Sequence, residues 1–184
     1  MPDSSFERIR TRRLVIRRFT PGDARALSEY RSDPEVARFQ GWQSPYTEEA
    51  ARAFIQSLSG SHPGVPGEWY QFAAAIRRTG RLAGDCAMLL DAGDPAVAEL
   101  GCTFDPRSQG RGYAGEALRA LMNYAASALG VTRLVAVTDR ENLTAIRLVS
   151  RLGFGEHTEP DRQPPSGPLG AHERLFERAT GMSG

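Results

Sequence analysis

The stretch 109–116, QGRGYAGE, places three glycines between an apparent strand and an apparent helix. Glycine adopts backbone conformations that other residues avoid, and without a side chain it lets a ligand approach the backbone closely. Three interpretations are open at this point: a tight turn, a dinucleotide-binding fingerprint, and a cradle for another kind of phosphate. The residues on either side of the stretch distinguish these three interpretations.

Three apolar runs precede the glycines. Residues 69–76, 82–90 and 97–104 are rich in strand-forming and other apolar side chains, and short turns separate the runs. Strands joined by short turns pair in antiparallel fashion. The chain is therefore predicted to form a three-strand antiparallel meander before it reaches the glycines.

A strongly amphipathic segment follows the glycines. Residues 113–129 carry apolar side chains at helical spacing, and Gly130 is suited to end the helix. A strand is expected over 132–138, and Asn142 is expected to cap a further helix. The order strand, helix, strand over 97–138 requires a right-handed crossover between two parallel strands.

The two ends of the chain add fewer elements. The sequence indicates a strand over 12–19, helices over 24–30 and 47–58, a loop over 59–68 and a last strand over 172–179. Pro34 is expected to break the first helix. Together these elements predict an α/β fold: a mixed, mostly antiparallel sheet with one parallel pair and with helices on both faces.

Composition limits the class of protein. The 184 residues, of which 40% are hydrophobic and 24% charged, fit a single domain over 1–184 with its core within 10–179. A formal net charge of +1 does not favour nucleic-acid binding. There is no apolar run of about 18 residues and no secretory signal, so we expect a cytoplasmic protein that does not bind a membrane. Cys86 and Cys102 lack metal-ligand spacing, and no metal is expected.

The dinucleotide interpretation has partial support. Gly110, Gly112 and Gly115 satisfy the G-x-G-x-x-G pattern, and Asp139 follows at a strand end. In that fingerprint, however, the first glycine follows its strand closely, whereas residues 105–109 intervene here. The antiparallel meander also supplies no further parallel units. A cradle for a pyrophosphate fits better, and coenzyme A carries a pyrophosphate without requiring a dinucleotide fold.

The glycine stretch also resembles a known motif. Gln109-x-x-Gly112-x-Ala114 is similar to the acetyl-CoA signature of the GNAT superfamily of N-acetyltransferases. The resemblance covers residues 10–158, and two motifs are similar to the subgroup of ribosomal-protein N-terminal acetyltransferases. The matching motifs outside the signature are Asn142-x-x-Ala145 and Leu152-Gly153-Phe154 for the superfamily, and Ala98-Glu99-Leu100-Gly101 and Arg12-Arg13-Leu14 for the subgroup.

The resemblance implies acetyl-CoA as co-substrate. The strand at Cys102, Thr103 and Phe104 is then expected to splay from the strand at 134–138 and to pair with the pantetheine arm. Asn142 is expected to donate to the pantetheine, to cap its helix, or to do both. The residues implied to hold the pyrophosphate through their backbone are Gln109, Gly110, Arg111, Gly112, Tyr113, Ala114 and Gly115.

Acid and base chemistry is less clear from the sequence. Glu99 is the candidate general base, acting through a water, and strand alternation places it on one face with Gly101 and Thr103. The alternative is an exposed strand glutamate. Many GNAT relatives carry a tyrosine as general acid seven residues after the asparagine, where this chain has Val149. The general acid is then Ser150 or a water molecule, or the protein has no dedicated acid.

The acceptor is expected to be a primary amine, either a peptide N-terminus or a small molecule. Phe39, Trp42 and Gln43 are the candidate residues for its pocket, although core packing is the favoured explanation for Trp42. The expected function is an N-acetyltransferase that acts as a monomer or homodimer. Two alternatives remain: an acyl-CoA-binding module without turnover, and an acetyltransferase for antibiotics of the aminoglycoside type.

Overall fold

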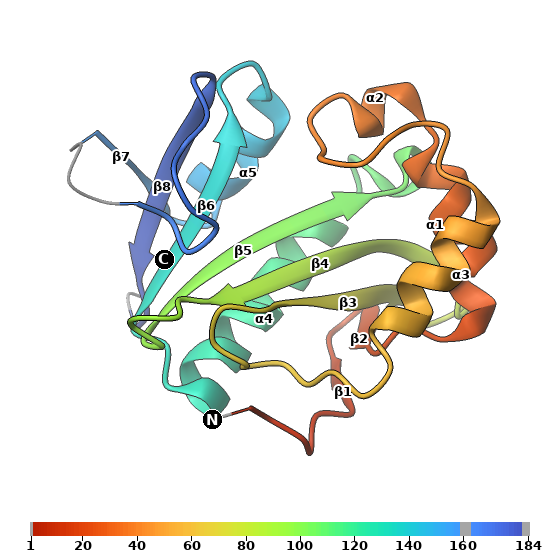
Figure 1. Ribbon diagram of the computed structural model, residues 1–184, viewed down its shortest axis with the longest axis horizontal. Helices are drawn as coiled ribbons and strands as arrows, with labels where there is room; N and C mark the ends of the chain where they lie inside the picture. Colours follow the sequence, from red (N-terminus) through yellow and green to blue (C-terminus); the bar gives the residue numbers. More distant parts are fainter. Residues whose placement is uncertain (1, 159–162, 182–184) are drawn as a thin grey trace.

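The computed structural model describes residues 2–158 and 163–181, which form one eight-stranded sheet with helices on both faces (Figure 1). The strand order is β1-β2-β3-β4-β5-β6-β8-β7. The strands are β1 (Arg8–Arg10), β2 (Leu14–Arg17), β3 (Trp69–Ile76), β4 (Leu82–Leu90), β5 (Val97–Phe104), β6 (Arg133–Asp139), β7 (Gly155–His157) and β8 (Glu173–Ala179). The helices are α1 (Ala24–Arg31), α2 (Pro34–Ala37), α3 (Glu48–Ser57), α4 (Tyr113–Leu129) and α5 (Leu143–Arg151).

The sheet is antiparallel except at its centre. β5 and β6 run parallel, and they pair only where Val97–Glu99 meets Arg133–Val135. Beyond this short ladder the two strands diverge toward their C-terminal ends, as Figure 1 shows. The predicted meander and the predicted splayed parallel pair are both confirmed.

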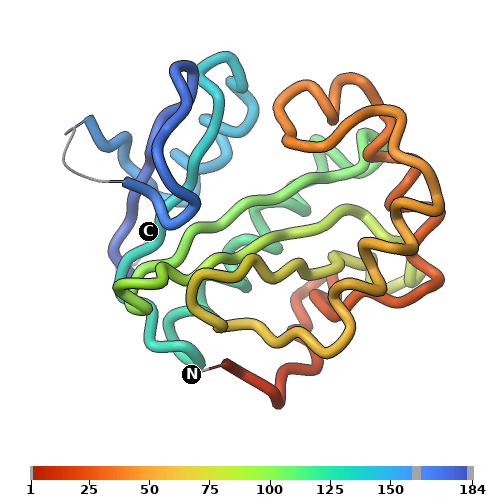
Figure 2. The backbone as a smooth tube through the Cα atoms, viewed as in Figure 1, coloured from red at the N-terminus to blue at the C-terminus, as the bar shows by residue number. Residues whose placement is uncertain are grey.

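The two faces of the sheet have different covers, as the tube in Figure 2 also shows. α4 and α5 cover the face that we call the rear, where the core includes Phe72, Leu100, Leu121 and Val149. α1 and α3 cover part of the opposite, front face, around Leu27 and other buried side chains. Because side chains alternate along a strand, the even-numbered residues of β5 face the rear and the odd-numbered ones face the front. No helix in the described part of the chain is long and apolar enough to cross a membrane.

The two ends of the chain differ from the sequence expectation in three respects. Pro34 does not simply end a helix but begins α2, because the side chain of Asp33 accepts hydrogen bonds from the backbone of Glu35 and Val36. The strand expected over 12–19 is limited to Leu14–Arg17. Short strands β1 and β7 at the sheet edges carry too few residues to show an alternating pattern, and they were not predicted.

Gly84 permits the close approach of β4 and β5. A Cβ atom at this position would lie 2.3 Å from the backbone oxygen of Thr103 and 2.7 Å from the Cα of Phe104. We therefore expect Gly84→Ala to lower the free energy of unfolding by about 1–3 kcal/mol, as overpacking typically does. Urea denaturation measures this loss. Gly101→Ala is the matched control, since its Cβ would meet only Ala87 Cβ at 4.0 Å, and an equal loss in both variants would contradict the explanation.

Candidate active site

The splay between β5 and β6 leaves part of the β5 backbone without a strand partner. Asp91 N donates to Val97 O, and Asp105 N donates to Ala83 O, both at 3.0 Å. In an antiparallel pair only every second residue of a strand bonds to its partner strand. These two bonds therefore show that the odd-numbered residues of β5 bond to β4. Leu100 and Cys102 therefore direct their backbone groups toward the β6 side. The pairing of Glu99 with Val135 still uses the Leu100 N–H, so the Leu100 carbonyl and both backbone groups of Cys102 are the ones that face the splay beyond the ladder. An extended ligand can pair with them as an added strand does.

The glycine loop at the end of β5 presents a row of free backbone amides. Gly110 and Gly112 have φ angles of 69° and 74°, which turn the chain into the start of α4. The first hydrogen bond of the helix runs from Glu116 N to Gly112 O. The backbone N–H groups of residues 110–115 have no acceptor among the residues that the structure describes. Free amides at a helix N-terminus suit a phosphate or diphosphate, so the loop fits the predicted pyrophosphate.

Gln109 differs from the other residues of the predicted cradle. Its backbone N–H already donates to the carbonyl oxygens of Asp105 and Pro106, both at 3.2 Å. Its side-chain Nε2 donates to Phe104 O at 2.8 Å. Gln109 therefore fastens the glycine loop to the end of β5.

Two charged residues to which the sequence patterns assign no role, Arg13 and Glu116, hold the glycine loop in place. Glu116 accepts from the Thr11 hydroxyl, from the Arg13 backbone and from Arg13 Nε, each at 2.6 Å. Arg13 also donates to Arg111 O at 2.8 Å, and its guanidinium lies over the Tyr113 ring at 4.8 Å. Burial alone raises the pKa of Glu116, but the hydrogen bonds from Thr11 and Arg13 outweigh it and lower that pKa. Glu116 is thus ionised at neutral pH and keeps the loop in place.

Glu99 is a buried carboxylate on the front face, with 5% of its surface exposed. It occupies the last position at which β5 pairs with β6, so its side chain sits where the splay begins. Its Oε2 accepts from the backbone N–H of Ser166 at 2.9 Å. Burial and the nearby charge of Glu173 raise the pKa of Glu99, and the hydrogen bond from Ser166 opposes them only in part. The alternative of an exposed strand glutamate is excluded.

Ser150 lies on the other side of the sheet from Glu99. It is exposed near the end of α5, and its hydroxyl donates to Ile146 O at 2.8 Å, one helical turn back. The preceding Val149 occupies the inward position and is buried in the rear core. This placement removes Ser150 from the candidate acids, because its hydroxyl is directed away from the splay and is engaged with the backbone of its own helix.

Asn142 sits at the open end of the splay. Its Oδ1 accepts from Ala145 N at 3.0 Å, so it caps α5 as expected, and its side-chain amide nitrogen remains available as a donor. The neighbouring Glu141 pairs with Arg38 at 3.1 Å. Arg38 belongs to the loop after α2, so this ion pair connects the two sides of the opening.

The predicted acceptor residues lie in this same loop. Arg38 stacks over Phe39 at 5.0 Å from the ring centre, and Gln43 is exposed. Trp42 is half-buried, and its Nε1 donates to Arg31 O at 3.0 Å. Both interpretations of Trp42 therefore remain compatible, because it packs against the front helices and still forms part of the loop near the opening.

A buried polar cluster fixes that loop, and no local sequence pattern indicates it. Arg31 pairs with Asp85 at 3.4 Å, and the Tyr30 hydroxyl also donates to Asp85. The Arg31 guanidinium lies 4.4 Å from the Trp42 ring centre and 4.6 Å from that of Phe54. Burial raises the pKa of Asp85, although Arg31 acts in the opposite direction. The cluster connects α1, the acceptor loop and β4.

Comparison with known proteins gives a consistent result. The model of the acetyltransferase (GNAT) domain matches residues 13–155. A Bacillus licheniformis protein named as an uncharacterized N-acetyltransferase is 30% identical over 150 residues, 81% of this chain and 83% of its own length. A Bacillus anthracis acetyltransferase of the GNAT family aligns with a TM-score of 0.78 at 25% identity, over 94% of this chain and 98% of its own.

One further solved structure shows the same fold at lower identity. It is a ribosomal L7/L12 α-N-protein acetyltransferase in complex with coenzyme A, with a TM-score of 0.73 and 17% identity. The alignment covers 94% of this chain and 98% of that one.

Proposed function

Because this chain belongs to the GNAT family of acetyltransferases, we propose that it transfers the acetyl group of acetyl-CoA to a primary amine, with Glu99 as general base. The acceptor is a peptide N-terminus or a small molecule. The observation that carries the proposal is the position of Glu99: a buried carboxylate where the splay begins, on the face that the acceptor loop borders.

Acetyl-CoA supplies a thioester whose carbonyl carbon is open to attack by an amine. The amides of residues 110–115 hold its pyrophosphate, and Arg13 with Glu116 keeps those amides aligned. The free carbonyl of Leu100 and the free backbone groups of Cys102 pair with the pantetheine arm, and the amide nitrogen of Asn142 donates to it. These contacts orient the thioester in the splay next to Glu99.

The reaction requires a neutral amine. Glu99 accepts the proton of the attacking amine through a water, and its raised pKa makes it a stronger base than an exposed glutamate. The amine nitrogen bonds to the acetyl carbon, the carbon–sulfur bond breaks, and the electron pair leaves on sulfur. A backbone N–H of β5 in the splay stabilises the oxygen that becomes negative during this step.

The leaving group departs without a side-chain acid from α5, since Val149 occupies the inward position there. A thiol has a pKa of about 8.5, so its thiolate is a much better leaving group than an alkoxide. The sulfur is protonated by water after it leaves. We propose that this costs the enzyme a moderate part of its rate.

The proposal is tested by mixing the purified protein with acetyl-CoA and a panel of short peptides, small amines and aminoglycosides. We expect thiol release that depends on one class of peptide or small amine, together with acetylation of that amine seen by mass spectrometry. Release on aminoglycosides alone supports the antibiotic alternative. Binding of acetyl-CoA without release on any acceptor supports the binding-module alternative and contradicts the proposed transfer.

A further inference from the structure

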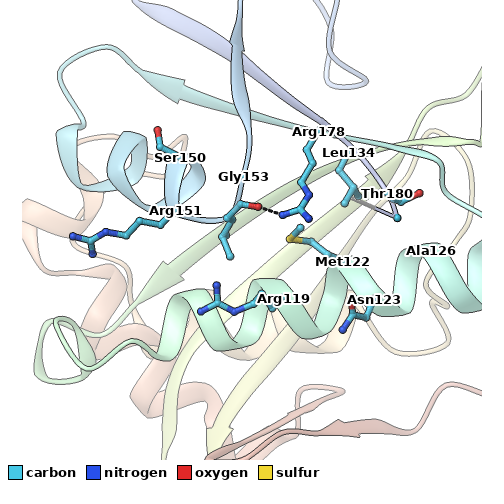
Figure 3. Close-up of a pocket in the computed structure, with 12 residues that line it drawn as sticks. Arg119, Met122, Asn123, Ala126, Leu134, Ser150, Arg151, Gly153, Arg178 and Thr180 are labelled. Atoms are coloured by element: carbon cyan, nitrogen blue, oxygen red, sulfur yellow. Dashed lines mark hydrogen bonds between the residues drawn. The ribbon is translucent and has the colours of Figure 1, made fainter. Parts of the chain in front are cut away.

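A cavity of about 470 Å³ lies on the rear of the molecule, where α4 passes the end of α5 and the end of β8 (Figure 3). Its described lining contains three arginines, one from each of these elements, and no carboxylate. They are Arg119 of α4, Arg151 of α5 and Arg178 of β8. The cavity therefore has a positive lining that its own residues do not neutralise.

Two of these arginines have free guanidinium groups. Arg119 and Arg151 are exposed, and neither makes a hydrogen bond or ion pair with a described residue. Arg178, in contrast, donates to Leu152 O. A guanidinium has a planar row of donors that fits a phosphate, so two free guanidinium groups that line the same cavity suit a phosphate dianion.

Arg119 lies beside the pyrophosphate cradle. Arg119 Nη2 is 3.5 Å from the position that a Cβ on Gly115, the last glycine of the cradle, would occupy. In Figure 3, α4 runs from Arg119 to Ala126, and the side chains of Arg119 and Arg151 both extend toward the side where α4 begins. Arg119 therefore borders both the cradle and the cavity, and Arg151 extends from the cavity toward the same end of α4.

We propose that Arg119 and Arg151 bind the 3′-phosphate of coenzyme A and make the protein discriminate against dephospho-CoA. This inference rests on the proposed function, because it places the pyrophosphate on the amides of residues 110–115. Those amides are neutral, and one row of them serves one diphosphate. The ribose 3′-phosphate is a separate dianion within a few bonds of the pyrophosphate, and the two free guanidinium groups can bind it.

The test compares the dissociation constants of CoA and dephospho-CoA by isothermal titration calorimetry. We expect the wild-type protein to bind CoA about tenfold more tightly, the effect of one or two charge-assisted hydrogen bonds. Arg119→Gln combined with Arg151→Gln should bring the two constants together by weakening CoA alone. Arg8→Gln is the matched control: Arg8 is exposed on β1 without a side-chain partner in the described chain, and its loss should leave the ratio unchanged.

Each other outcome is also informative. Equal binding of CoA and dephospho-CoA by the wild type overturns this inference and leaves the proposed function intact. A failure of both ligands to bind overturns the proposed function itself. Binding of inorganic phosphate to the CoA-saturated protein, lost in the double variant, assigns the arginine pair to a free anion and also overturns the inference. Thermal unfolding of the double variant, followed by circular dichroism, verifies that the exposed substitutions leave the fold unchanged.

Discussion

Glu99→Gln is expected to lower kcat for acetyl transfer by about 10²–10⁴-fold, the usual contribution of a positioned general base. The amide keeps the size of the side chain and can still accept the hydrogen bond from Ser166 N, but it cannot take a proton from the amine. Steady-state thiol release with saturating acetyl-CoA measures the effect. Glu49→Gln removes an exposed carboxylate of α3 and should leave kcat unchanged. A Glu99→Gln variant with wild-type kcat would exclude Glu99 as the base.

The pH dependence follows from the same group. Burial raises the pKa of Glu99 above its ordinary value of 4.5, so kcat/KM should fall as the pH drops through that raised pKa.

The effect of Glu99 on the free energy of unfolding has a pH dependence opposite in sign to that of a salt-bridged carboxylate. The folded state holds the proton of Glu99 more tightly than the unfolded state, so this group's stabilising contribution is lost as the pH rises from 4.5 through the raised value. Glu99→Gln should therefore unfold at an equal or higher temperature than the wild type at pH 7–8. A lower melting temperature there would contradict this account.

Gly112→Val is expected to weaken CoA binding by at least about tenfold, because a left-handed conformation costs a β-branched residue about 1–3 kcal/mol. Gly112 has φ 74°, and its added Cβ would also lie 3.3 Å from Nη2 of Arg13, which braces the loop. The loop will relax into another conformation, and binding must then restore the original one. Calorimetric titration with CoA measures the loss.

The chain offers a matched control for this substitution at the other end of the same helix. Gly130 also has φ 74°, and a Cβ there would meet nothing within 4 Å. Gly130→Val should therefore destabilise the protein through backbone strain without changing its affinity for CoA. Equal losses of affinity in both variants would show that the glycine loop has no special role in binding.

The features that the sequence predicted are those with a local signal. The meander over β3–β5 follows from alternating apolar runs and short turns, and α4 follows from an apolar stripe with glycines at both ends. The splay followed from the family resemblance, since nothing in the residues of β5 or β6 says how far the two strands pair. The position of Glu99 on the front face followed from strand alternation.

The features that escaped the sequence depend on contacts between distant segments. Glu116 meets Arg13 across 103 positions, and Glu99 meets Ser166 across 67. No periodicity links such pairs. Ser150 is a different case: it neighbours Val149, but one step along a helix turns a side chain by about 100°, and here that step leads from the core to the exposed side. The helical spacing of the apolar residues around it already indicates that Val149 points inward and Ser150 does not.

Hydrogen–deuterium exchange with and without CoA shows whether CoA binds in the splay and on the glycine loop. The free N–H groups of Cys102 and residues 110–115 should exchange quickly in the protein alone, because they have no acceptor in the described chain. CoA should slow exchange in peptides covering 98–104 and 109–116. Protection confined to another region, such as the cavity beside α3 that Arg18 and Gln71 line, would contradict the account, as would no protection at all.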